Sequence, residues 1–220
     1  MSLWLLFKDE LKGFYKSNVM IILWIGLPLL SVIFYLFMPN PDNQASISFI
    51  TSGIISSFGG WLAAMMLAIQ IIHEESHHVY DLFLIRPVRR SQIILSKYLA
   101  VFFCVALACI LALFLSFFAD YFFINKYSSA LVLETIKSLV ISLAIISIEC
   151  AAGAFVGVMV SSVIVGVILV VVTHNISSLT IIMPLMTKPH YPLLYPVVVG
   201  ISLSVVFLFL SIEMFKRKQF

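Results

Sequence analysis

The sequence predicts an all-α membrane protein, and three observations support this class. Hydrophobic residues make up 62% of the 220-residue chain and charged residues only 10%, whereas soluble domains carry roughly 25% charged residues. The apolar residues form continuous runs, and a run of about 20 residues can cross a bilayer as a helix. The runs do not alternate between polar and apolar residues as the strands of a membrane β-barrel do. The composition therefore excludes a soluble enzyme, a disordered chain and a nucleic-acid-binding protein.

The first predicted element is an amphipathic helix over residues 1–16, which we expect to lie in the membrane interface. Lysines repeat every four residues along one stripe of this helix, and large apolar residues at helical spacing share another face. These apolar residues are Trp4, Phe7, Leu11 and Phe14. A simple extension of the first span is the alternative, but Gly13 and the following Ser17 offer a bend.

Six apolar runs follow, and they predict six transmembrane helices in one domain that covers residues 1–220. The runs cover about residues 18–38, 46–72, 93–118, 139–160, 163–183 and 193–212. If both termini are cytoplasmic, only Lys126, Lys137 and Lys188 of the 13 Lys and Arg residues fall in outer segments. This asymmetry follows the positive-inside rule and predicts cytoplasmic N- and C-termini.

A long polar segment on the predicted cytoplasmic side, residues 73–92, contains an apolar patch bounded by charges. The patch and its flanks are Asp81, Leu82, Phe83, Leu84, Ile85, Arg86, Pro87 and Arg89. Pro87 ends any helix that precedes it, and a new helix is predicted to begin near Ser91, with Lys97 snorkelling to the interface. Such a segment suits docking into a groove on a cytosolic partner. The alternative is that the patch lies on lipid.

The start of the same segment matches the zinc-protease pattern H-E-x-x-H, with His73 and His77 as ligands and Glu74 as general base. The pattern needs a third ligand. Asn40-Pro41-Asp42 lies on the opposite side of the membrane in the predicted topology, and Asp81 lies one turn beyond the pattern. We expect a solvated helix end without metal, and an intramembrane zinc metalloprotease is the alternative.

Polar residues within two of the apolar runs form a candidate buried site. Glu149 lies midway along the fourth run, and His174 and Asn175 lie midway along the fifth. Counted from the turn at Ser161, Glu149 and His174 reach the same depth of an antiparallel hairpin. An ionised carboxylate at that depth is costly, so we expect Glu149 to be neutral, to pair with His174 or to face an aqueous cavity. Its role is either a structural hydrogen bond or a polar point in a transport path.

Small residues in two runs predict close helix packing. Gly153 and Gly157 form a G-x-x-x-G pattern, and Gly60, Ala64 and Ala68 form a second small-residue stripe. Both patterns allow helices to approach closely. They do not by themselves identify a dimer face.

The stretch from Glu74 to Ala100 resembles the segment between the second and third spans of ABC-2 type exporter permeases. The family pattern is an acidic pair, an apolar patch, Pro-Val, Arg, an apolar stretch and Gly-Lys. Its counterparts here are Glu74-Glu75, Leu82 to Leu84, Pro87-Val88, Arg89 or Arg90, Ile93 to Leu95, and Lys97. His78 and Ser96 stand where the family usually has glycine. The sequence around Pro87 is most similar to that of the branch that includes the copper-site maturation permease of nitrous oxide reductase.

The resemblance implies a type-2 ABC exporter fold, in which substrate transport and ATP hydrolysis are carried out by separate chains. Two permease subunits, identical or related, would form the substrate path in the plasma membrane of a bacterium or archaeon. A separate ABC ATPase would dock on the segment after the second span and would bind ATP and Mg²⁺. The present chain has no G-x-x-x-x-G-K-[ST] phosphate loop, so we expect it to be no enzyme by itself and to hold no cofactor. A membrane anchor subunit without transport activity is a further alternative.

Overall fold

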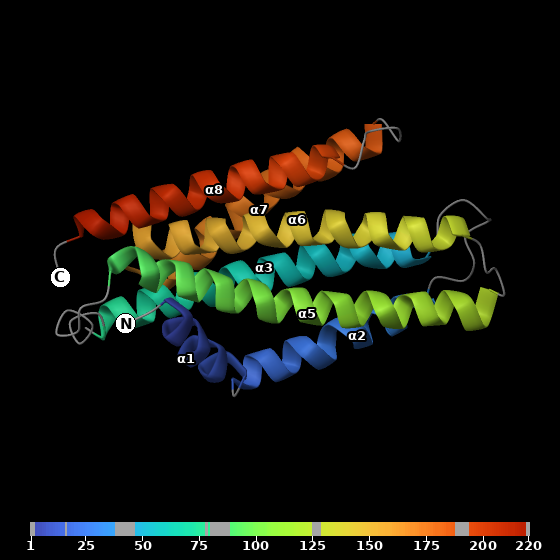
Figure 1. Ribbon diagram of the computed structural model, residues 1–220, viewed down its shortest axis with the longest axis horizontal. Coiled ribbons are helices and arrows are strands. Elements are labelled where there is room, and N and C mark those ends of the chain that lie inside the picture. Colours follow the sequence, from blue (N-terminus) through green and yellow to red (C-terminus); the bar gives the residue numbers. More distant parts are fainter. Residues whose placement is uncertain are drawn as a thin grey trace.

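Seven helices make up the part of the chain that the structure describes. The structure is a computed structural model, and it describes residues 3–15, 17–37, 47–77, 79, 89–124, 129–187 and 194–218. The helices are α1 (Leu3–Tyr15), α2 (Asn18–Phe37), α3 (Ile47–Ser76), α5 (Arg90–Ile124), α6 (Ser129–Met159), α7 (Val163–Thr187) and α8 (Leu194–Arg217). The long helices run side by side, and α1 lies at an angle to them near one end (Figure 1). The described residues of the six predicted apolar runs thus lie almost entirely in helices α2, α3, α5, α6, α7 and α8.

Four helices are long and apolar enough to cross a membrane over the described residues. These candidate spans are Ile55–Ser76, Arg90–Phe118, Thr135–Met159 and Leu194–Arg217. The helical segments Leu3–Tyr15 and Met20–Leu30 meet at 66° and would add a fifth span only as one broken element. The all-helical class is therefore confirmed, and four of the six predicted spans meet the criterion among the described residues.

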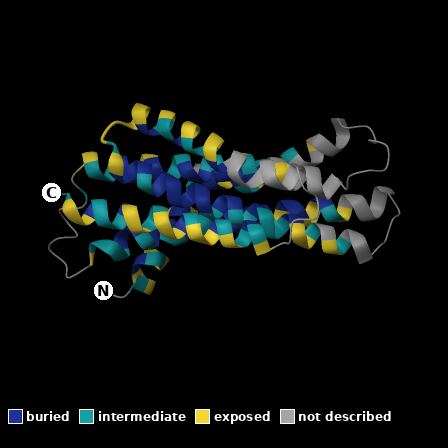
Figure 2. Cartoon of the chain, turned by 90° about the horizontal axis from the view of Figure 1, so that it is seen from above, coloured by how far each residue is buried: buried dark blue, intermediate teal, exposed yellow. Residues whose placement is uncertain are grey.

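The outer faces of the bundle carry large apolar side chains. Ile164 on α7 is 73% exposed and Phe209 on α8 is 67% exposed. Buried residues run along the middle of the bundle, while exposed residues line its outer faces (Figure 2). Soluble monomers rarely expose apolar surface on this scale. These faces are therefore suited to lipid, which agrees with the apolar composition.

Helix α6 lies at the centre of the bundle and packs against α3, α5, α7 and α8. Its glycines face the small-residue stripe of α3. A Cβ atom on Gly153 would lie 2.5 Å from the carbonyl oxygen of Ala64, and one on Gly157 would lie 3.0 Å from the Cα of Ala68. The two small-residue patterns thus form one interface, because only residues without bulky side chains let the α3 and α6 backbones approach so closely.

Helix α1 has the predicted amphipathic character, but most of its apolar face lies on protein. Phe7, Leu11 and Phe14 pack against the main core of the bundle, and the Phe7 ring meets Phe103 of α5 edge-on at 6.3 Å between centroids. Trp4 is 68% exposed. An apolar face is needed for contact with either lipid or protein, so helical spacing alone does not distinguish the two environments.

Candidate functional site

Both termini and the two helix ends that flank residues 77–89 lie at one end of the bundle (Figure 1). The start of α5 and the residue before it, together with the end of α8 and the residue after it, bring basic residues to this end. They are Arg89, Arg90, Lys97, Lys216, Arg217 and Lys218. Of the described basic residues, Lys137 lies on the part of α6 nearer the opposite end. The charge asymmetry predicted from the sequence thus corresponds to an asymmetry along the bundle.

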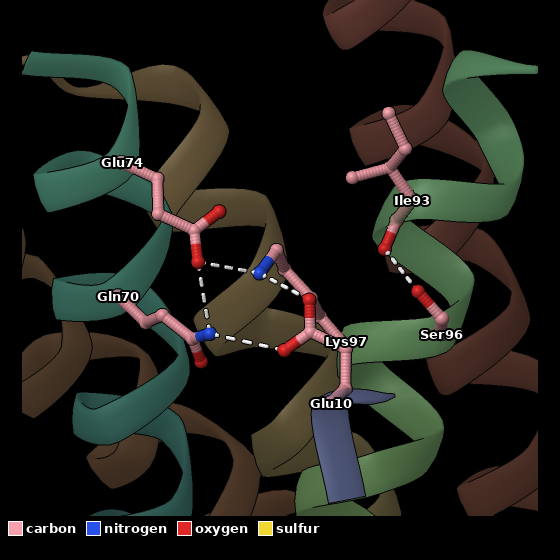
Figure 3. Close-up of polar contacts among 6 residues, drawn as sticks. All are labelled: Glu10, Gln70, Glu74, Ile93, Ser96 and Lys97. Atoms are coloured by element: carbon pink, nitrogen blue, oxygen red, sulfur yellow. Dashed lines mark hydrogen bonds and ion pairs between the residues drawn. The ribbon is translucent and has the colours of Figure 1, made fainter. Parts of the chain in front are cut away.

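A polar cluster joins α1, α3 and α5 at this end, as Figure 3 shows. The Lys97 ammonium donates hydrogen bonds to Glu10 Oε1 at 2.7 Å and to Glu74 Oε1 at 2.6 Å. The Gln70 amide donates to Glu10 Oε2 at 3.2 Å and to Glu74 Oε1 at 2.9 Å. We call these four residues, Glu10, Gln70, Glu74 and Lys97, the polar cluster.

The prediction that Lys97 snorkels to the interface is wrong. The side chain of Lys97 is only 1% exposed, and those of its two carboxylate partners are 19% and 18% exposed. Two carboxylates from other helices meet the ammonium inside the bundle, so it satisfies its charge there without reaching water. Lys97 is therefore a structural link between three helices.

The polar cluster carries two carboxylates against one ammonium, so one negative charge is left over if all three groups are ionised. Among the described residues, no donor reaches two of its buried acceptor atoms, Gln70 Oε1 and Glu74 Oε2. An ion pair in such surroundings contributes to stability only while all its members remain. Loss of the one cation would leave the carboxylates without compensation.

The C-terminal end of α8 is linked by hydrogen bonds and an ion pair to the start of α5 and the end of α3. Arg90 Nη1, at the start of α5, donates to the carbonyl oxygens of Lys216 at 3.2 Å and Lys218 at 2.7 Å. The Lys218 ammonium lies 2.5 Å from a carboxylate oxygen of Glu75 near the end of α3. The helix ends on either side of residues 77–89 are thus held by α1 through the polar cluster and by α8 through its last residues.

Most of the predicted docking segment lies outside the described residues. This holds for Asp81, Leu82, Phe83, Leu84, Ile85, Arg86 and Pro87. Arg89 is described, and it is exposed immediately before α5 begins. The structure therefore places the anchoring points of the segment and one of its predicted contact residues.

The two histidines of the H-E-x-x-H pattern share one exposed helix face, with rings stacked at 4.1 Å between centroids. His77 Nδ1 lies 2.9 Å from the carbonyl oxygen of His73. Glu74 is turned away from them and pairs with Lys97. No group of three metal-binding side chains occurs within the described ranges. In this arrangement Glu74 forms an ion pair with Lys97, so it does not take the position of a general base beside the histidines.

The second polar site lies between α6 and α7, where the hairpin register predicts it. Glu149 is fully buried, and His174 Nδ1 lies 3.3 Å from its Oε1. The hydroxyl of Ser177 forms a hydrogen bond with the same carboxylate oxygen. On the other side, Gly60 of α3 provides space, since a Cβ atom there would lie 2.9 Å from Glu149 Cγ. The third predicted residue, Asn175, is exposed and donates to the carbonyl oxygen of Val171 at 2.7 Å.

Three residues of these sites were not predicted, although the sequence carries signals for two of them. Ser177 follows His174 by three residues and therefore shares its helix face. Gln70 precedes Glu74 by four residues on α3 in the same way. Glu10 has no such signal, because it meets Lys97 across 87 positions of the chain. Lys97 shares its helix face with Ile93, Ile94, Ala100 and Val101, which are all core residues, but their apolar character alone does not distinguish a protein core from lipid.

No protein-family model matches the sequence, and no curated protein matches it.

Proposed function

We propose that this chain is the permease subunit of an ABC exporter, with two permease subunits forming a substrate path between them. A separate ATPase, carrying ATP and Mg²⁺, docks on residues 77–89 and drives the cycle. The proposal combines the resemblance of residues Glu74 to Ala100 with the helical architecture. It includes six spans, of which α2 and α7 supply the two beyond the four candidate spans.

The observation that carries the proposal is that the helix ends on both sides of the predicted docking segment are linked by polar contacts to α1 and α8. Its preceding helix end is linked to α1 through Gln70, which donates to Glu10, and to α8 through Glu75. Its following helix end is linked to the same two helices through Lys97 and Arg90. A partner that pulls on such a segment acts on the whole bundle, because the segment ends in helices tied to both termini. A loop lying passively on lipid would not need these ion pairs.

The orientation follows from the basic end of the bundle. Lysine and arginine are retained on the cytoplasmic side of membrane proteins. We therefore infer that this end, with both termini, faces the cytoplasm of a bacterium or archaeon. This orientation places residues 77–89 where a cytosolic ATPase can reach them.

The proposal is tested by purifying the tagged chain from its native membranes and measuring Mg²⁺-dependent ATP hydrolysis in the isolated complex. We expect a copurifying subunit with a phosphate-binding loop, identified by mass spectrometry. Arg89→Glu places a negative charge in the docking segment, and like charges across an interface cost several kcal/mol. Since each 1.4 kcal/mol is tenfold in affinity, we expect the copurified ATPase activity to fall by about tenfold or more.

Lys137→Glu is the matched control, because it makes the same charge change at an exposed position nearer the other end of the bundle. This variant should retain the ATPase. A chain that purifies intact with no nucleotide-hydrolysing subunit would contradict the proposal. Stoichiometric zinc that is lost in His73→Ala would point to a metalloprotease instead.

A further inference from the structure

We propose that Glu149, His174 and Ser177 form a proton-binding site inside the membrane, in which the carboxyl and the imidazole share one proton. This inference does not depend on the exporter assignment. It concerns the hairpin of α6 and α7, far from the polar cluster at the end of the bundle. We call these three residues the proton site.

The first argument is the geometry around Glu149. The side chain is fully buried, one oxygen meets both Ser177 and His174, and the other oxygen, Oε2, has no partner among the described residues. The facing His174 Nδ1 lies 3.3 Å away and also lacks a regular hydrogen bond. An imidazole nitrogen and a carboxyl oxygen that are this close, and both buried, are favourable neighbours only when one of the two groups carries an added proton.

The second argument is the hydroxyl of Ser177, which has a single proton and at least two acceptors within reach. It lies within hydrogen-bond distance of Glu149 and 3.0 Å from the carbonyl oxygen of His174. When the carboxyl is ionised, Ser177 donates to it. When the carboxyl is protonated, it can donate to Ser177, whose own proton then goes to the carbonyl oxygen. Both protonation states of Glu149 are thus accommodated by one hydroxyl rotation.

The third argument is the cost of removing the proton. An ionised carboxylate beside a neutral imidazole would be an uncompensated charge within the membrane, which costs several kcal/mol. A protonated carboxyl beside a neutral imidazole, or a carboxylate beside an imidazolium, has no net charge. Both of these states hold one proton more than a carboxylate beside a neutral imidazole, so the site binds one added proton whichever atom carries it.

No other charged group competes for Glu149 in the described part of the molecule. Its neighbour on α3 is Gly60, and α7 contributes His174 and Ser177. Cys150 is the adjacent residue on α6 and is itself buried as a free thiol. The described charged side chains of α5 and α8 lie at the basic end of the bundle. The imidazole of His174 is 18% exposed, so it is the most exposed member of the proton site.

The test uses the purified full chain in lipid nanodiscs at neutral pH. Infrared spectroscopy detects a protonated carboxylic acid, and ¹⁵N NMR of labelled histidine distinguishes a neutral from a doubly protonated ring. We expect either an acid carbonyl band that Glu149→Gln removes or a doubly protonated His174, whose signal His174→Gln identifies. Glu213→Gln is the control, because Glu213 pairs with Arg217 on the bundle surface; it should leave both signals unchanged.

A neutral His174 together with the absence of an acid band would overturn the proposal, because no proton would then be held. If Glu149→Gln fails to fold, a neutral His174 and the absence of any acid band in the unsubstituted protein still overturn the proposal, and a band that is present is assigned to Glu149 by its shift in Ser177→Ala. Ser177→Ala tests the hydroxyl separately. It should keep the proton but shift the acid band or the His174 signal, since the carboxyl loses a hydrogen-bond partner. An unshifted spectrum would remove Ser177 from the site.

Discussion

Replacing Lys97 by methionine is expected to destabilise the protein by about 3 kcal/mol, because breaking a buried ion pair by removing one partner leaves an uncompensated charge. Methionine preserves the long unbranched stem, so the change removes the charge with little loss of packing. Glu10 and Glu74 would then face each other across Gln70 without a cation. The loss should be visible as a lower midpoint of thermal unfolding, followed in detergent by the monodisperse fraction that remains after heating.

A compensating variant separates charge from packing. Combining Lys97→Met with Glu10→Gln and Glu74→Gln removes all the charges of the polar cluster and should restore most of the lost stability. Lys137→Met makes the same substitution at an exposed position and should change the stability by no more than about 0.5 kcal/mol. If Lys97→Met unfolded at the same temperature as the unsubstituted chain, the polar cluster would have to be hydrated and would not hold α1 against α3 and α5.

The helical architecture was predictable because lipid leaves the backbone few alternatives. A continuous apolar run has no water to satisfy its amide groups, so it forms a helix that satisfies them internally. The register of a short-turned hairpin then follows from counting, which is how Glu149 and His174 could be placed at one depth. The structure brings these two side chains together at 3.3 Å. The residue spacing along α6 and α7 and the position of the turn between them were sufficient to predict this part of the candidate site.

The polar cluster was not predictable in the same way, because its members come from three helices that are distant in the sequence. Lys97 lies on a helix end, where snorkelling is the usual outcome. Only the docking of α1 brings Glu10 to it, and that docking depends on tertiary packing of Phe7 and Phe14. Counting charges along the chain could not show that Lys97 pairs with both Glu10 and Glu74. The outcome depends on which helices are neighbours.

The contact between α3 and α6 gives a second prediction with a large effect. Gly153→Ala adds a single methyl group, but that group would lie 2.5 Å from the carbonyl oxygen and 2.6 Å from the Cα of Ala64. Both contacts are with backbone atoms, so no side-chain rotation relieves them. The two helices must separate, and we expect a loss of about 3 kcal/mol, at the upper end of the usual cost of overpacking. The same thermal unfolding measurement applies.

Two other glycines provide a graded series. Gly157→Ala would place its methyl group 3.0 Å from the Cα of Ala68, so its effect should be smaller. Gly26→Ala on α2 meets nothing within 4 Å and should stabilise the helix by about 0.5–1 kcal/mol, because alanine loses less backbone entropy than glycine. Ala64→Gly should not rescue Gly153→Ala, since the clash is with the main chain. If all three alanine variants gained stability alike, the α3 and α6 backbones could not be in contact at Gly153, and the central packing of the bundle would have to be different.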